Sequence, residues 1–157
     1  ASVSSKTTEK TEKEWFPMVY LLTGQKGSGK TQRMMDLANE QVKSCKGNLV
    51  FLKSSHRDTR NVGFDIRVVC MDDYPAIKNS DGFIGFLYGM FSANHDLECV
   101  FIDGLFKHAD ICIDNLPAFV KRLKQLSAEC GINYFVSLSA KPEDLVGEAF
   151  EGCQLIS

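Results

Sequence analysis

The stretch Leu21–Met35, "LLTGQKGSGKTQRMM", decides the fold class of this chain. Within it, residues 24–31 satisfy the pattern GxxxxGK[ST] without a mismatch. A short apolar run, "MVYLL" (18–22), precedes the pattern, and apolar residues recur at helical spacing over residues 31–46. We therefore expect a buried strand, a glycine-rich loop and a helix in direct succession.

The composition of this loop suits a phosphate group. Glycines let backbone N–H groups turn inward around an anion, and the start of the following helix offers further amides. Lys30 can reach the β- and γ-phosphates of a nucleotide, and the Thr31 hydroxyl can take a Mg²⁺ position. We therefore expect ATP and Mg²⁺ as ligands, with nucleotide contacts from Gly24, Gln25, Lys26, Gly27, Ser28, Gly29, Lys30, Thr31 and Gln32.

A second acidic group for the metal is expected at Asp103. This residue ends the apolar run "CVFID" (99–103). In a parallel sheet the carboxyl ends of the strands meet on the ligand side, so Asp103 is expected to face Thr31. Asp103 and Thr31 are the predicted metal ligands, and Lys30 and Asp103 the predicted catalytic residues.

Strand and helix patterns alternate along the chain. Beyond the first unit, strands are expected at residues 48–52, 65–70, 99–103, 133–139 and 153–157, and helices at 82–91 and 115–130, with a short helix or turn at 142–150. This alternation predicts an α/β fold, a three-layer αβα sandwich around a mostly parallel sheet.

Length and charge fit one globular domain. The chain has 157 residues and a formal net charge of -2, which gives no reason to expect nucleic acid or an anionic membrane as partner. It contains no apolar run of about 18 residues and no apolar segment near its start. We expect residues 1–16 to be a polar tail, flexible or appended, residues 17–157 to be one nucleotide-binding domain, and the location to be cytoplasmic.

The six cysteines form no CxxC pair. Most lie in or beside apolar runs, as buried reduced thiols of a cytosolic protein do. A zinc site or a disulfide framework would need tighter spacing. We therefore expect no function from them.

The order of these motifs resembles two groups of P-loop nucleoside triphosphatases, the RecA-like ATPases and the type II thymidine kinases. The similarity rests on "YLLTGQKGSGKT", on "VFIDG" in the acidic-strand place and on a following helix and strand with a polar residue, Ser137 or Ser139. It also includes "VFLKSSHRDTR" (50–60) after the second strand. The resemblance implies the P-loop nucleoside triphosphate hydrolase fold and ATP as substrate.

The chain departs from both groups at the general base. The resemblance implies a Glu near the acidic strand, and in the kinases it directly follows the Asp, where this chain has Gly104. The paired cysteines and the nucleoside-gripping segment of the kinases are also absent. Glu98, Asp110 or Asp114 can replace the base from nearby, although a solvated charge or a helix cap is the commoner role for such residues.

Three further loops carry chemistry-bearing side chains near expected strand ends. The loop 54–60 supplies His56, Arg57, Asp58 and Arg60. An arginine there can bind a phosphate, or the loop is an exposed polar one. The acidic stretch 71–74 can hold a metal or an amine, or form a solvated turn. Lys107 and His108 follow Asp103 closely enough to contact a γ-phosphate.

Three functions are compatible with the sequence. The preferred one is a Mg·ATP-binding protein with weak ATP hydrolysis. The alternatives are a nucleoside or small-molecule kinase resembling thymidine kinase, and a non-hydrolysing ATP-dependent switch that acts through a protein partner. ATP is preferred over GTP because the guanine-reading N-K-x-D motif is missing. A homo-oligomer in which a neighbouring subunit supplies an arginine is a further expectation from the RecA-like resemblance.

Overall fold

The computed structural model describes residues 17–56, 62–63 and 65–156. Its strands are β1 (Val19–Thr23), β2 (Asn48–Lys53), β3 (Ile66–Cys70), β4 (Leu97–Ile102), β5 (Asn133–Leu138) and β6 (Gln154–Ile156). Its α-helices are α2 (Lys30–Ser44), α3 (Ser80–Ala93) and α4 (Leu116–Cys130). Short 3-10 turns, η1 (Met71–Asp73), η2 (Leu105–Lys107), η3 (Pro142–Asp144) and η4 (Glu148–Phe150), lie in the connections.

The six strands form one sheet in the order β3-β2-β4-β5-β1-β6, and every strand pair is parallel. The predicted α/β fold is therefore confirmed, and the sheet of the described residues is wholly rather than mostly parallel. β5 lies between β1, which leads into the glycine-rich loop, and β4, which leads into Asp103. The carboxyl ends of these three neighbouring strands thus meet at one edge of the sheet.

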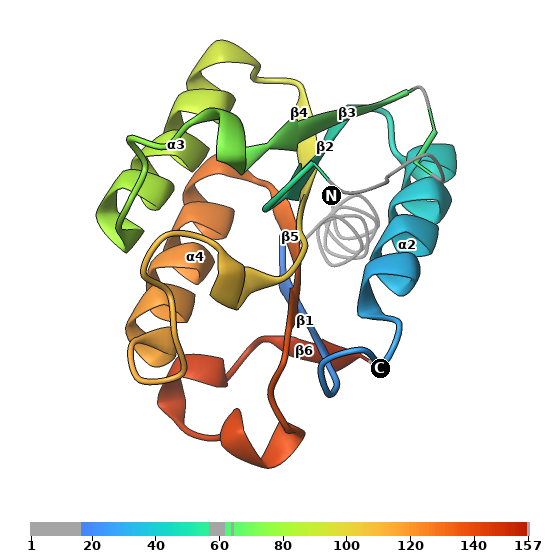
Figure 1. Ribbon diagram of the computed structural model, residues 1–157. Helices are drawn as coiled ribbons and strands as arrows, with labels where there is room; N and C mark the ends of the chain where they lie inside the picture. Colours follow the sequence, from blue (N-terminus) through green and yellow to red (C-terminus); the bar gives the residue numbers. More distant parts are fainter. Residues whose placement is uncertain (1–16, 57–61, 64, 157) are drawn as a thin grey trace, which may run out of the picture.

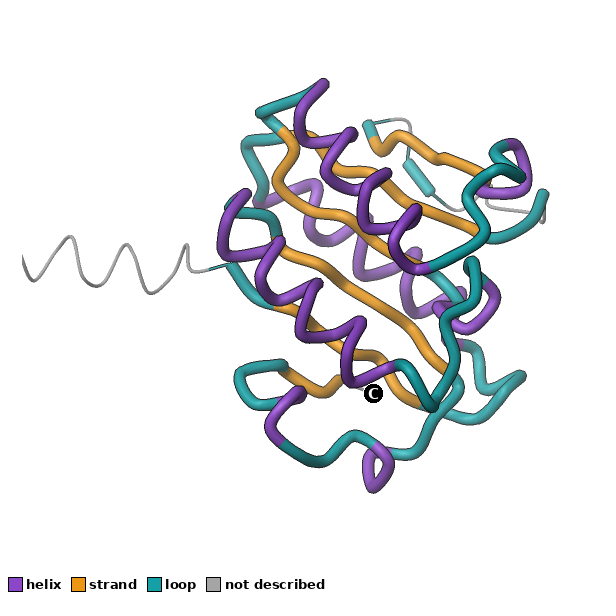
Figure 2. Tube along the Cα trace, turned by 90° about the vertical axis from the view of Figure 1, so that its left-hand side faces the viewer, coloured by secondary structure: helices purple, strands orange, loops and turns teal. Residues whose placement is uncertain are grey.

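Helices cover both faces of the sheet. α3 and α4 lie on one face and α2 on the other (Figure 1). Figure 2 looks onto the first face, where α3 and α4 run side by side across the strands. Each face has its own cluster of buried side chains, and alternate residues of the strands contribute to the two clusters. This arrangement is a three-layer αβα sandwich.

The helices bury the faces that their sequences predict. In α2, Met34 and Ala38 are fully buried at four-residue spacing. In α4, the buried side chains are Leu116, Phe119, Val120, Leu123, Leu126 and Ser127. The three glycines of the 82–91 stretch do not break α3, because its apolar residues Phe83, Ile84 and Leu87 pack into the core and outweigh the low helix propensity.

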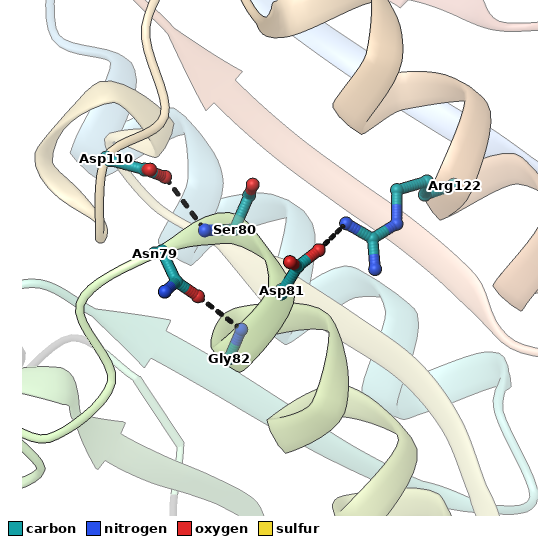
Figure 3. A network of polar contacts seen from close by, with 6 residues as sticks. All are labelled: Asn79, Ser80, Asp81, Gly82, Asp110 and Arg122. Atoms are coloured by element: carbon teal, nitrogen blue, oxygen red, sulfur yellow. Dashed lines mark hydrogen bonds and ion pairs between the residues drawn. The ribbon is translucent and has the colours of Figure 1, made fainter.

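Polar contacts tie the start of α3 to its surroundings (Figure 3). The Asn79 side chain caps the helix by accepting from the Gly82 N–H at 2.8 Å. The Ser80 N–H donates to Asp110 Oδ1 at 2.8 Å, and Asp81 pairs with Arg122 of α4 at 2.5 Å. The Ser80 contact holds the segment that follows Asp103 against the start of α3, and the Asp81–Arg122 pair joins α3 to α4.

Several boundaries differ from the expected ones by one or two residues. α2 ends at Ser44, with Cys45 in an extended conformation, so Lys46 and Gly47 lie beyond the helix. Asn115 is the N-cap residue of α4, but its side chain makes no capping hydrogen bond to the helix. It instead accepts from the Cys112 N–H and donates to the Asp110 carbonyl. Within the described residues, no helix has the length and apolar character that crossing a bilayer requires.

Candidate functional site

A cavity of about 520 Å³ opens at the carboxyl edge of the sheet. Every residue that lines it follows or ends β1, β2, β4 or β5, or belongs to the first turn of α2. The lining consists of Lys26, Gly27, Gly29, Lys30, Thr31, Ser54, Asp103, Gly104, Phe106, Lys107, Ser137 and Ser139. Its size is in the range of small-molecule binding sites.

Part of the glycine-rich loop (residues 24–29) forms one wall of this cavity. Lys26, Gly27 and Gly29 line it, whereas the predicted contacts Gly24, Gln25 and Ser28 are not among the lining residues. Gly27 and Gly29 have φ of 81° and 86°, in the left-handed region that favours glycine. The loop closes with a bond from the Ser28 N–H to the Gln25 carbonyl at 3.1 Å. α2 then begins at Lys30, and its first-turn amides, including those of Lys30 and Thr31, have no partner inside the helix and point toward the loop. The wall therefore offers backbone donors to an anion.

The Lys30 ammonium lies over the loop. Nζ donates to the Gln25 carbonyl at 2.7 Å and to the Gly24 carbonyl at 3.2 Å. Burial lowers the pKa of Lys30, Asp103 counteracts that effect and Lys107 adds to it. Lys30, Asp103 and Lys107 line the same cavity, so the three side chains can act on the same ligand.

Asp103 is held between two hydroxyl groups. The Thr31 Oγ1 donates to Asp103 Oδ2 at 2.9 Å, and the Ser137 Oγ donates to Asp103 Oδ1 at 2.9 Å. The Ser137 Oγ also accepts from the Gly104 N–H at 2.8 Å. The expected proximity of Asp103 and Thr31 is confirmed, and the fully buried Ser137 fixes the orientation of the carboxylate.

Gly104 has φ 66° and ψ 60°, a left-handed conformation from which the chain turns into η2. A side chain at this position would be strained, so the turn disfavours the Glu that the thymidine-kinase resemblance places there. None of the alternative bases lines the cavity. Asp110 is engaged by Ser80, Glu98 lies at the opposite edge of the sheet near Cys45, and Asp114 is exposed. Asp103 is the one carboxylate among the described lining residues.

The side chains of Lys107 and His108 lie in different surroundings. Lys107 is exposed, lines the cavity and passes over Gly104. His108 is buried, its ring packs against Phe83, and its Nε2 lies 2.8 Å from the Asp103 carbonyl oxygen. Because burial lowers the His108 pKa and a carbonyl only accepts, Nε2 carries the proton and donates. Lys107 is thus available to a ligand, whereas His108 supports the backbone of Asp103.

Other predicted residues lie away from the cavity or outside the described part of the chain. Gln32 Nε2 donates to Asp36 one turn along α2 at 2.9 Å. His56 Nε2 lies 2.6 Å from Asp73 Oδ1 of η1, so the acidic stretch 71–74 has a side-chain partner within the chain itself. Arg57, Asp58 and Arg60 lie outside the described residues, and their proposed phosphate contact stays a prediction.

Sequence reasoning missed two lining residues, Ser54 and Phe106. Ser54 could have been predicted from its position directly after β2, because ligands bind at the carboxyl ends of parallel strands. Phe106 had no such signal, because its position depends on the turn at Gly104.

Comparison of the sequence with known families and with curated proteins gave no match. No known protein-family model matches this chain, and no curated protein matches it in sequence.

Proposed function

We propose that this chain binds Mg·ATP in the cavity at the carboxyl edge of the sheet and hydrolyses it slowly, as a cytoplasmic P-loop protein related to the RecA-like ATPases. The observation that carries the proposal is the contact of Thr31 Oγ1 with Asp103 Oδ2 at 2.9 Å, beside Lys30 and the glycine-rich loop. Thr31 and Asp103 are 72 positions apart in sequence, yet the fold brings their side-chain oxygens together beside the glycine-rich loop.

The two oxygens fit a magnesium ion. Mg²⁺ binds oxygen ligands octahedrally at 2.0–2.1 Å, so oxygens on adjacent vertices lie about 2.9 Å apart. The hydroxyl of Thr31 and the carboxylate of Asp103 already have this separation. The Ser137 hydroxyl donates to the other carboxylate oxygen of Asp103, Oδ1, so it does not compete with Thr31 for Oδ2. Thr31 and Asp103 would therefore hold the ion without rearrangement of the backbone.

The charge of the cavity fits a polyphosphate. Lys26, Lys30 and Lys107 line it together with a single described carboxylate, Asp103. The loop amides would bind phosphate oxygens, and Lys30 would exchange its two carbonyl contacts for them. Mg²⁺ supplies charge neutralisation at the β- and γ-phosphates when it is bound.

The residues of the cavity support slow rather than fast hydrolysis. Asp103 is engaged by Thr31 and Ser137, and no second carboxylate among the described lining residues can accept a proton from water. Positioning and electrostatic stabilisation by the lysines remain as the sources of rate enhancement. A homo-oligomer or a protein partner that adds a cation at the open side of the cavity would raise this rate.

The conformation of Gly104 favours a second candidate function, an ATP-dependent switch that does not hydrolyse its nucleotide. The left-handed turn at Gly104 leaves the site without a base next to Asp103. Such a protein would present a different surface to a protein partner with and without ATP.

Phosphate release separates the candidates. The full chain is incubated with Mg·ATP, and release is compared with that of Asp103→Asn and of the matched control Asp114→Asn, which alters an exposed carboxylate outside the cavity. The proposal predicts release slower than about 1 s⁻¹ that requires Mg²⁺, is lost in Asp103→Asn and is unchanged in Asp114→Asn. Tight binding without release would favour the switch, and acceleration by an added nucleoside would favour the kinase alternative. Failure of the chain to bind ATP at all would refute the proposal.

A further inference from the structure

Three potential metal ligands lie close together near the amino ends of the strands, at the end of the sheet opposite the proposed nucleotide cavity. Cys45 follows the last residue of α2, and Glu98 and Cys99 lie near the start of β4. The two thiol sulfurs and a Glu98 carboxylate oxygen all lie within 4.8 Å of one another. The Cys45 thiol donates to Glu98 Oε2. The sequence spacing gave no sign of this cluster, because 53 residues separate Cys45 from Glu98.

An irregularity in β4 explains how neighbouring residues reach the same cluster. In a regular strand, consecutive side chains point to opposite faces. In the pairing of β2 with β4, however, Asn48 is opposite Leu97 and Leu49 is opposite Cys99, so Glu98 is an extra residue on β4. Such a bulge re-aims a side chain. It places the Glu98 carboxylate beside the Cys99 thiol instead of across the sheet from it.

Amide groups near the two sulfurs favour the thiolate form. The Gly47 backbone amide lowers the pKa of Cys45, and the side chain of Asn133, the register partner of Cys99 on β5, lowers the pKa of Cys99, although burial outweighs both effects. Gly47 has to be a glycine for this approach, since a Cβ there would lie 2.3 Å from the Asp96 carbonyl oxygen and 3.0 Å from the Glu98 Cβ. Donors of this kind orient ligands and stabilise the thiolate form that binds a metal.

The cluster is accessible from solvent on one side. Cys45, Glu98, Cys99 and Asn133 line a cavity of about 260 Å³ between the end of α2 and the start of β5. Cys99 is buried, whereas Cys45 and Glu98 are half-buried. The cavity gives a cation a path of entry and room for a water molecule as a further ligand.

We propose that Cys45, Glu98 and Cys99 bind a divalent cation of the zinc class, with water as the fourth ligand. Zinc takes cysteine sulfur at about 2.3 Å and carboxylate oxygen at about 2.0–2.2 Å in tetrahedral sites, which sets ligand atoms between about 3.4 and 3.8 Å apart. Side-chain rotations within the cluster suffice for these separations, because all three ligand atoms already lie within 4.8 Å. Thiolates select this class of metal over Mg²⁺ and Ca²⁺.

Binding exchanges protons for the metal. Burial and the neighbouring Glu98 raise the pKa of Cys45 to about 11, and burial raises that of Cys99 as well. Without a cation both thiols are therefore protonated at neutral pH. One cation displaces the two thiol protons and binds two thiolates and one carboxylate, so two protons pass to solvent for each ion bound.

Cobalt provides the direct test, since Co²⁺ occupies tetrahedral zinc sites and its bond to a thiolate gives a near-ultraviolet charge-transfer band. The full chain is reduced, freed of metal with a chelator and titrated with Co²⁺ and then with Zn²⁺. We expect one Co²⁺ per chain with this band and with the visible bands of tetrahedral cobalt, displacement by Zn²⁺, and a higher unfolding temperature with Zn²⁺.

Variants assign the bands to the cluster. Cys45→Ser, Cys99→Ser and Glu98→Gln remove one ligand each and are expected to abolish the one-to-one tetrahedral spectrum. Cys112→Ser changes an exposed thiol elsewhere, and Cys70→Ser changes the thiol beside His56 and Asp73; both retain the spectrum. Circular dichroism shows which variants are folded, and Glu98→Gln keeps the test decisive if a buried cysteine variant does not fold.

Two results would overturn the proposal. One is a reduced, folded protein without the cobalt bands, or with bands that survive Glu98→Gln and Cys45→Ser. The other is a disulfide between Cys45 and Cys99, detected by peptide mapping after oxidised glutathione treatment, in a protein whose reduced form binds no Co²⁺. That result would make the pair a redox couple rather than a metal site.

Discussion

Ser137→Ala tests how the candidate site is held together. The Ser137 hydroxyl is fully buried, donates to Asp103 Oδ1 at 2.9 Å and accepts from the Gly104 N–H at 2.8 Å. A hydrogen bond to a charged group contributes about 1.5–3 kcal/mol, and an N–H left without its partner costs about 1–3 kcal/mol. Because Asp103 is only partly buried and water can reach it, we take the lower part of each range and expect a loss of about 2.5–4 kcal/mol in the free energy of unfolding.

Urea unfolding followed by circular dichroism measures this loss, with Ser139→Ala as the matched control. Ser139 lines the same cavity two residues further along, is exposed, and has no side-chain hydrogen bond within the described part of the chain, so its replacement is expected to change the stability by less than about 0.5 kcal/mol. Since Ser137 orients a predicted metal ligand, its loss is also expected to weaken Mg·ATP binding about tenfold. Equal stability of Ser137→Ala and Ser139→Ala would refute the reasoning about the Asp103 contacts.

Three other substitutions test the fold around the site. Asn79→Ala removes the cap of α3 and should lower the free energy of unfolding by about 1 kcal/mol, measured in urea against the exposed, distant Lys43→Ala. Gly104→Ala forces a side chain into the left-handed turn and should lower it by about 1–2 kcal/mol; an unchanged or higher stability would mean that the turn is not strained. Tyr134→Phe removes a buried hydroxyl that has no partner within the described residues and should raise the stability by about 1 kcal/mol. Burial raises the Tyr134 pKa above the unfolded value near 10, so the Tyr134 hydroxyl of the unfolded chain loses its proton at a lower pH than that of the folded chain, and stability falls as the pH rises above about 10. Thermal unfolding scans should therefore show a smaller loss of stability at alkaline pH in Tyr134→Phe than in the unaltered chain. An equal loss in both proteins would contradict the assignment of this pH dependence to Tyr134.

The sequence predicts the cavity at the carboxyl edge of the sheet because the main parts of that cavity are local. The glycine-rich loop, its strand and its helix are contiguous, and burial of both faces of a parallel sheet gives its strands continuous apolar runs. The proximity of Asp103 and Thr31 followed from one general rule about strand ends, without knowledge of the strand order. The sequence narrowed the polar residue after the acidic strand to Ser137 or Ser139, and the end of β5 at Leu138 separates the two: Ser137 is buried within the strand, whereas Ser139 lies beyond it and is exposed.

The features that escaped prediction depend on contacts between distant segments. His108 turns inward because the left-handed Gly104 and the following η2 direct its ring toward Phe83. The Cys45, Glu98 and Cys99 cluster needs both the end point of α2 and a one-residue irregularity between β2 and β4. A bulge leaves no pattern in a single sequence, so spacing rules for cysteine ligands could not find this cluster.

The most direct test of the central claim is calorimetric titration of the full chain with Mg·ATP, compared with Lys30→Ala and with the control Lys43→Ala in the last turn of the same helix. A hydrogen bond from a charged group contributes about 1.5–3 kcal/mol, so we predict that Lys30→Ala weakens binding by about ten- to 150-fold. Lys43→Ala, which is exposed and outside the cavity, should bind as the unaltered chain does. Equal affinity of Lys30→Ala and the unaltered chain would contradict the assignment of the glycine-rich loop as a nucleotide site.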